Sequence, residues 1–199
     1  MFVEALDVEA AQAAGLTLIG EPLAIDLVNT AKLAKEPPLD LLADDRANRA
    51  FWRLEAPRLP AGWEPPSLGD AHTLRSAIRS LLESRISGET PEQSAIQIVN
   101  RFAAAASSSP QLTVDWASAA DSRAADGAAA LLGAVAHSAI DVLTGDTADR
   151  LHRCAADDCS MLFVATNAKR QWCTSAGCGN RQRVARHATR QRDLASASA

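Results

Sequence analysis

Apolar residues recur at helical spacing through most of the first 145 residues and predict a mainly α-helical fold. Prolines, glycines and capping residues interrupt this pattern and mark the expected helix ends. The helices predicted in this way cover residues 22–30, 40–56, 67–87, 90–106 and 128–143. The last of them is apolar on nearly all sides, so we expect it to be a central, buried helix with His137 in the core.

Shorter stretches alternate between apolar and polar residues and predict a few strands. One is expected to run from Leu16 to Gly20, and a weak hairpin is expected from residues 111–116 and 122–125. Near the C-terminus, residues 160–166 form a strand-like run, and residues 167–173 read as a turn into a second strand. These two runs predict a hairpin within an otherwise separate module.

Charge divides the 199-residue chain into two parts of opposite sign. Residues 1–149 hold 11 Lys/Arg and 21 Asp/Glu, a net of −10, whereas residues 150–199 hold 9 and 3, a net of +6. With the break at Gly145–Thr147, this predicts a helical domain over 1–145 and a small module over 146–199. The chain has no run of eighteen apolar residues and no basic segment near Met1, so we expect no membrane span or export signal and a cytoplasmic protein.

All four cysteines of the chain lie within 25 residues, as two C-x4-C pairs separated by thirteen residues. Four thiolates satisfy a tetrahedral zinc ion, and a pair of short turns can supply them. The alternatives are two disulfides or four unrelated buried thiols. We expect one zinc ion held by Cys154, Cys159, Cys173 and Cys178. Because these residues fill all four positions, the zinc is expected to be structural, in a zinc-ribbon or treble-clef finger with Phe163 and Trp172 packed beneath it.

An arginine-rich helix is expected directly after Cys178. Nothing between Gly179 and Arg192 breaks a helix, and at about 100° per residue one face carries Arg183, Arg186, His187 and Arg190. Val184 and Ala188 share another flank, suited to packing against the finger. Such a basic stripe favours nucleic-acid binding, but an ordinary solvated face, or docking on the acidic N-terminal domain, explains it as well.

Three polar residues, Asp26, Asn29 and Thr30, lie on or near the polar edge at the end of the first helix. They are candidates for a small-molecule pocket, with helix capping and interhelical hydrogen bonding as the alternative. His152 is expected at the surface or behind the metal ligands rather than as a ligand. No nucleophile with its base, phosphate loop or dinucleotide fingerprint occurs, so we do not expect an enzyme.

The residues around the cysteines resemble the CGNR zinc finger, whose name matches Cys178-Gly-Asn-Arg181, with Trp172–Cys173 and Phe163 in place. The segment from Gly20 to Thr30 is similar to the start of the ABATE domain that usually precedes this finger. Proteins of this bacterial family are described as candidate transcription regulators with a nucleic-acid-binding zinc ribbon. The resemblance therefore implies a helical N-terminal domain, a structural zinc finger and a regulatory role.

Together, these features predict a DNA-binding regulator whose last helix contacts phosphates. The expected contact residues are Arg181, Arg183, Arg186, Arg190 and Arg192. The N-terminal domain would then sense a small-molecule effector or form a homodimer. Two alternatives stay open: an RNA-binding protein, and a protein-interaction or ligand-sensing module in which zinc staples the tail to the acidic domain without nucleic-acid binding.

Overall fold

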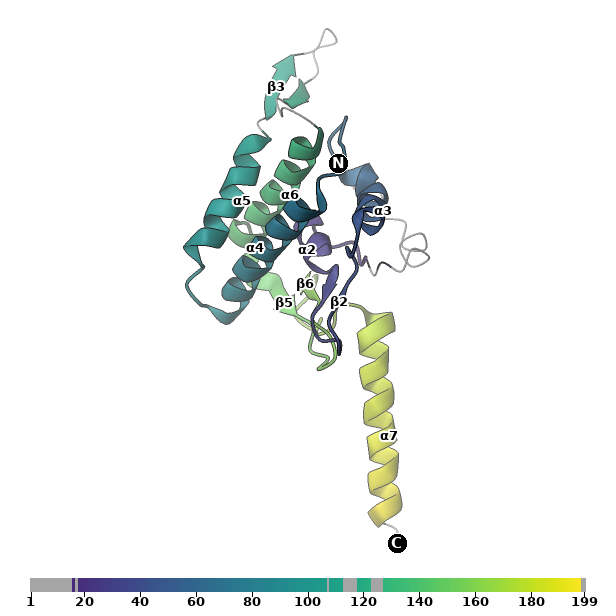
Figure 1. The fold of residues 1–199 in the computed structure, drawn as a ribbon. Coiled ribbons are helices and arrows are strands. Elements are labelled where there is room, and N and C mark those ends of the chain that lie inside the picture. The colour runs from purple at the N-terminus through teal and green to yellow at the C-terminus, as the bar shows by residue number, and fades with distance from the viewer. Residues whose placement is uncertain (1–15, 17, 107, 113–117, 123–126, 198–199) are drawn as a thin grey trace.

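The computed structural model describes residue 16 and residues 18–106, 108–112, 118–122 and 127–197. The described chain is mainly helical, with three two-stranded antiparallel sheets, and one long helix at the C-terminal end projects from the body (Figure 1). This architecture confirms the predicted fold class, a helical part followed by a small four-cysteine finger that ends in a basic helix.

Three long helices form the body: α4 (Leu68–Ser87), α5 (Gln93–Ala105) and α6 (Gly127–Thr144). They lie side by side, and the short helix α2 (Leu23–Val28) packs against α4 and α6 (Figure 1). The approach of α6 to the end of α5 is close at Gly133, where an added Cβ would lie 1.8 Å from the Cβ of Ala106. Any larger residue at this position would force the two helices apart.

Local capping chemistry explains where α4 begins and ends. The Ser67 hydroxyl accepts a hydrogen bond from Asp70 N at 3.0 Å, and Gly88 closes the helix with φ +72°. These bounds confirm the prediction for residues 67–87. Helix α5 instead begins at Gln93 after the N-cap Glu92, so Pro91 precedes the helix rather than lying in its first turn.

The second predicted helix is shorter than the pattern indicated. Helix α3 (Asp45–Glu55) starts where the Asp44 carboxylate accepts from Ala47 N, and a 3-10 turn, η1 (Ala56–Arg58), follows it. Asp40, the expected start, instead belongs to β2 (Leu39–Asp40), which pairs with β1 (Ala31–Lys32). The apolar residues before Asp44 are therefore used by a strand and a turn.

The predicted hairpin exists, with strands a few residues earlier than expected. Strand β3 (Ser108–Leu112) pairs with β4 (Ser118–Ser122), and residues 113–116 and 123–125 of the prediction lie outside the described residues. The strand expected to end at Gly20 is wrong over residues 18–20, which are irregular. Leu16 and Leu18 are buried in the core, so their alternation reflects burial without pairing.

Helix α6 is a core helix, as its composition predicted. It is long and apolar enough to cross a membrane by length and composition alone, a test that core helices also pass. Here Leu131, Val135 and Ala136 are fully buried, and the helix contacts α2, α4 and α5. The expectation for His137 is wrong: its side chain is exposed on the outer side of the helix.

The C-terminal finger shares the core of the body. After the 3-10 turn η2 (Ala148–Arg150), β5 (Leu151–Arg153) pairs with β6 (Leu162–Val164). Residues 167–173 therefore do not supply the partner strand, which lies before the first cysteine. A short π-helical turn, η3 (Ser175–Gly179), then leads into α7 (Asn180–Ala197). Leu151 and Leu162 belong to the main hydrophobic core, so the finger docks on the body through its hairpin.

Two carboxylates are buried beside a single arginine where α2 meets the end of α3. Arg58 Nη1 lies 2.8 Å from both Asp26 Oδ2 and Glu55 Oε2, while Asp26 Oδ1 and Glu55 Oε1 are buried with no hydrogen-bond partner among the described residues. Burial raises the pKa of Asp26 to about 6 and, with the nearby Asp26 charge, that of Glu55 to about 8. One arginine cannot balance both charges.

We predict that these two groups make the free energy of unfolding fall as pH rises from about 4 to about 8. Both folded-state pKa values lie above the ordinary ones, so these groups favour the folded chain below their unfolded pKa values and lose that contribution as pH rises through about 6 and 8. Glu55→Gln should flatten the decline, as measured by urea unfolding. Glu64→Gln, at an exposed position, serves as control, and an unchanged slope in Glu55→Gln would contradict the prediction.

Candidate metal centre and basic helix

The first cysteine pair is positioned by the β5–β6 hairpin. Cys154 directly follows β5, and its amide donates to Met161 O at 2.9 Å. Cys159 lies in the connecting turn, where its amide donates to Ala156 O at 3.0 Å. The hairpin therefore holds both thiols on one short turn, as a zinc knuckle requires.

The second pair is positioned by the turn that starts α7. Cys173 precedes Thr174, whose hydroxyl accepts from Gly177 N at 3.0 Å and whose carbonyl accepts from Gly179 N at 3.0 Å. This turn folds Cys178 back toward Cys173. The start of α7 is thus fixed to the same point as the hairpin.

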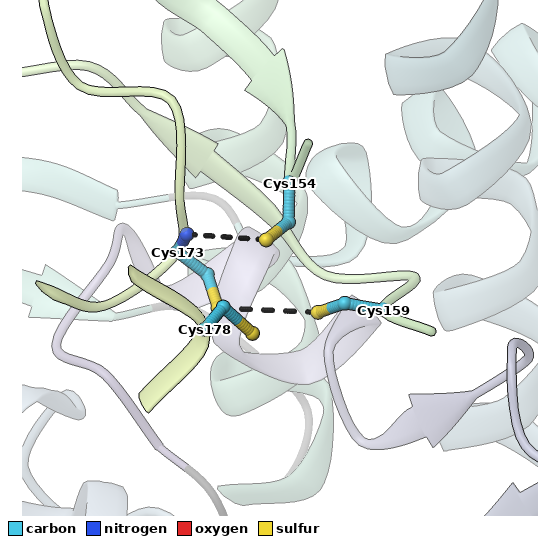
Figure 2. A group of neighbouring side chains, drawn as sticks. All are labelled: Cys154, Cys159, Cys173 and Cys178. Atoms are coloured by element: carbon cyan, nitrogen blue, oxygen red, sulfur yellow. Dashed lines mark hydrogen bonds between the residues drawn. The ribbon is translucent and has the colours of Figure 1, made fainter. Parts of the chain in front are cut away.

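All four Sγ atoms lie within 4.8 Å of one another (Figure 2). The Sγ atoms of Cys159 and Cys173 are 3.9 Å apart, and those of Cys173 and Cys178 are 3.6 Å apart. A tetrahedral zinc ion with bonds of about 2.3 Å sets its sulfur ligands roughly 3.8 Å apart. The cluster therefore has the dimensions of a four-cysteine zinc site. His152 is exposed and is not part of it.

Burial and hydrogen bonds among the cysteines shift the pKa values of their thiols in different directions. Hydrogen bonding from Cys173 lowers the pKa of Cys159 to about 5, and the same bond raises the pKa of Cys173. Burial raises the pKa of Cys178 to about 11. Without a cation the cluster thus favours one thiolate held by neighbouring thiols, and a dication would favour loss of the remaining protons.

A buried cation, Lys32, lies beside the cysteine cluster. Its position suits a zinc centre whose four thiolates leave a net negative charge. Lys32 Nζ is buried and finds no hydrogen-bond acceptor among the described residues. Burial lowers the pKa of Lys32, whereas the nearby Cys159 and Cys173 raise it. Four thiolates and one zinc dication carry a net charge of −2, which offers Lys32 the missing counter-charge. The residues present therefore fit one structural zinc ion.

The sequence pattern gave no sign of Lys32, because the residue reaches the cysteines only through the fold. It lies more than 120 residues from Cys159, and nothing in the local pattern of residues 31–40 indicates a metal centre. The apolar residues under the cluster are those expected, with Phe163 buried and Trp172 partly buried against it.

Helix α7 extends away from the body (Figure 1), and its side chains from Arg183 to Asp193 are exposed. Arg181 pairs with Asp158 at 2.8 Å, Arg183 Nη2 donates to Ser175 O, and the Arg186 guanidinium lies 5.5 Å from the Trp172 ring. Arg190 and Arg192 are exposed further along the helix. The expected packing of Val184 and Ala188 against the finger is wrong, since Val184 is 60% exposed and Ala188 is exposed.

Asp26, Asn29 and Thr30 are buried rather than at a polar edge. The Asn29 side chain donates to Leu162 O and accepts from Leu162 N, each at 2.9 Å. It therefore satisfies the backbone of β6 as a neighbouring strand would. Thr30 Oγ1 donates to Leu27 O and accepts from Arg75, and Asp26 pairs with Arg58. The structure does not bring the three into one site: each contacts a different part of the fold.

We predict that the full chain purified without added metal contains about one zinc per chain. Cys173→Ser should lower this content, because it removes the sulfur that lies nearest two others, whereas Ser175→Ala should leave it unchanged. Metal analysis and thiol titration before and after chelation measure the outcome. A metal-free protein with four titratable thiols and an intact finger would rule out the zinc site.

Comparison with known families agrees with this geometry. The sequence model of the ABATE family, described as a putative stress-induced transcription regulator, matches residues 21–146, and that of the CGNR zinc finger matches residues 150–191. A search of curated proteins finds no match. The first match spans more than half of the chain and the second contains all four cysteines, so the chain belongs to the ABATE family and carries a CGNR zinc finger.

Proposed function

We propose that the protein is a cytoplasmic DNA-binding transcription regulator in which the zinc centre presents α7 to the phosphate backbone. The observation that carries this proposal is the placement of α7: an arginine-rich helix that is exposed from Arg183 to Asp193 and contacts the finger near its start. Both matched families are regulatory and zinc-finger types rather than enzymes, which supports a regulatory role.

Charge supports nucleic acid as the partner. Residues 150–199 carry +6, and a zinc ion with four thiolates leaves about +4. Beside α7, a hollow of about 480 Å³ is lined by Lys169 and Arg183 together with Trp172. Positive side chains thus continue from the helix onto the finger, in an arrangement that suits consecutive phosphates.

The projection of α7 also limits interference from the acidic body. Its 18 residues span about 27 Å, and Arg190 and Arg192 lie about 15 Å or more beyond Asn180. The distance from Asn180 to these arginines exceeds the Debye length of about 8 Å at physiological ionic strength, so the charges of the body are largely screened there. The contacts of α7 with its surroundings described above remain within the finger, which favours nucleic-acid binding over docking on the N-terminal domain.

The second part of the proposal is an effector site in the body. A largely apolar hollow of about 490 Å³ lies between α4, α5 and α6, with Leu81, Val99 and Leu143 in its wall and Arg85 and Glu89 at its edge. Asp26, Asn29 and Thr30 do not line it. A small amphipathic effector would therefore bind at this hollow rather than at the residues that the sequence suggested.

We predict that duplex DNA binding weakens with salt and depends on α7. The triple change Arg183→Ala, Arg186→Ala and Arg190→Ala should reduce the slope of log affinity against log salt by about 3, since each lost phosphate contact lowers it by roughly 0.9. Fluorescence anisotropy with a labelled duplex at several salt concentrations measures this slope.

The matched control removes three exposed arginines from helix α3: Arg46→Ala, Arg49→Ala and Arg53→Ala. It changes the net charge equally but should leave the slope nearly intact. Equal losses in the two triple variants, or no binding at low salt, would contradict the proposal. Competition by single-stranded RNA that exceeds competition by duplex DNA would favour the RNA alternative.

A further inference from the structure

Lys32 brings the N-terminal part of the chain to the metal centre. It ends strand β1, and the next residue, Leu33, donates its amide hydrogen to Ser160 Oγ at 2.8 Å, which ties β1 to the turn of Cys159. A hollow of about 250 Å³ is lined jointly by Lys32 and by Cys159, Cys173 and Cys178. The Lys32 ammonium is thus enclosed between β1 and the cysteines.

A buried ammonium without an acceptor is costly. Among the described residues nothing accepts a hydrogen bond from Lys32 Nζ, although the atom is buried. Removing such a charge from water is unfavourable unless an opposite charge compensates it. Lys35, three residues later in the same loop and lining the same hollow, is exposed. The enclosure of Lys32 therefore points to a negative partner close by.

The zinc-bound cysteines are the partner that fits. Thiolate sulfurs bound to zinc still accept hydrogen bonds, and donors within the finger already reach some of those sulfurs. Cys173 N lies 3.4 Å from Cys154 Sγ, and Arg181 Nη2 lies 3.4 Å from Cys178 Sγ. Groups of this kind around a metal orient its ligands and tune its affinity. Among the described contacts, no cationic side chain of the finger donates to the Sγ atom of Cys159 or Cys173, the two cysteines on the side of Lys32.

We propose that Lys32 is a positioning residue of the zinc centre, which balances the charge of the four thiolates from the N-terminal part of the chain. The metal centre is then completed only when the finger docks on the helical body. By thermodynamic linkage, zinc binding strengthens that docking, and docking strengthens zinc binding by the same factor. The ABATE part of the chain would thereby stabilise the zinc-bound form of the CGNR finger.

The test compares zinc binding by the full-length protein with Lys32→Met, which keeps the aliphatic stem and removes the charge. We expect zinc affinity, measured by competition with a chromophoric chelator, to fall about 10-fold to 100-fold. Lys32→Arg should recover part of the loss. Lys35→Met, which removes the exposed neighbouring charge, should bind zinc as the parent protein does.

Two further readouts separate this role from simple packing. In the cobalt-substituted protein, Lys32→Met should shift the sulfur-to-cobalt charge-transfer band to lower energy, since the sulfur lone pairs lose a nearby positive charge. In the metal-free protein, the same variant should lose less stability to urea than it does in the zinc-bound protein, because a cluster with fewer thiolates offers Lys32 less negative charge.

Each of three results would overturn the proposal. These are equal zinc affinities for Lys32→Met and the parent, an unchanged cobalt spectrum, and an equal loss of stability in the zinc-bound and metal-free forms. Binding of inorganic phosphate that needs Lys32 while zinc affinity does not would also overturn it and would assign the hollow to an anion. None of these measurements involves DNA, so they succeed or fail independently of the proposed function.

Discussion

The meeting of four thiolates at one point is the constraint on which the C-terminal third of the structure depends. It joins the hairpin of β5 and β6 to the first turn of an 18-residue helix that has little buried apolar surface of its own. Helix α7 is exposed from Arg183 to Asp193 and contacts mainly the turn that contains Cys178. Its direction is therefore set by the metal centre rather than by packing.

The finger in turn is fixed to the body by polar groups at the edge of β6. Asn29 completes the backbone bonding of Leu162, and Glu21 accepts from Val164 N and pairs with Arg170 at 2.7 Å. Because Glu21 and Asn29 flank helix α2, the body and the zinc centre form a connected unit. These contacts place the acidic body on one side of the finger and the basic helix on the other (Figure 1).

Local patterns predicted those features that depend on local chemistry. Ser67 and Gly88 bound α4 because capping is decided within one turn, and the cysteine spacing indicated the metal centre because zinc demands four thiolates. Features that depend on distant segments were missed. Asn29 pairs across 133 residues, and Lys32 reaches the cysteines only through the fold. Such contacts leave no periodicity in the sequence.

Hydrogen–deuterium exchange of the full-length protein, with zinc and after chelation, tests the central claim most directly. If the metal holds the hairpin and the start of α7 together, chelation should speed exchange at the amides of Cys154, Cys159 and Gly179, whose hydrogen bonds frame the cluster. Exchange in α4 and α6 should change little, since their core is independent of the cysteines. Identical exchange of residues 151–183 with and without metal would contradict the account.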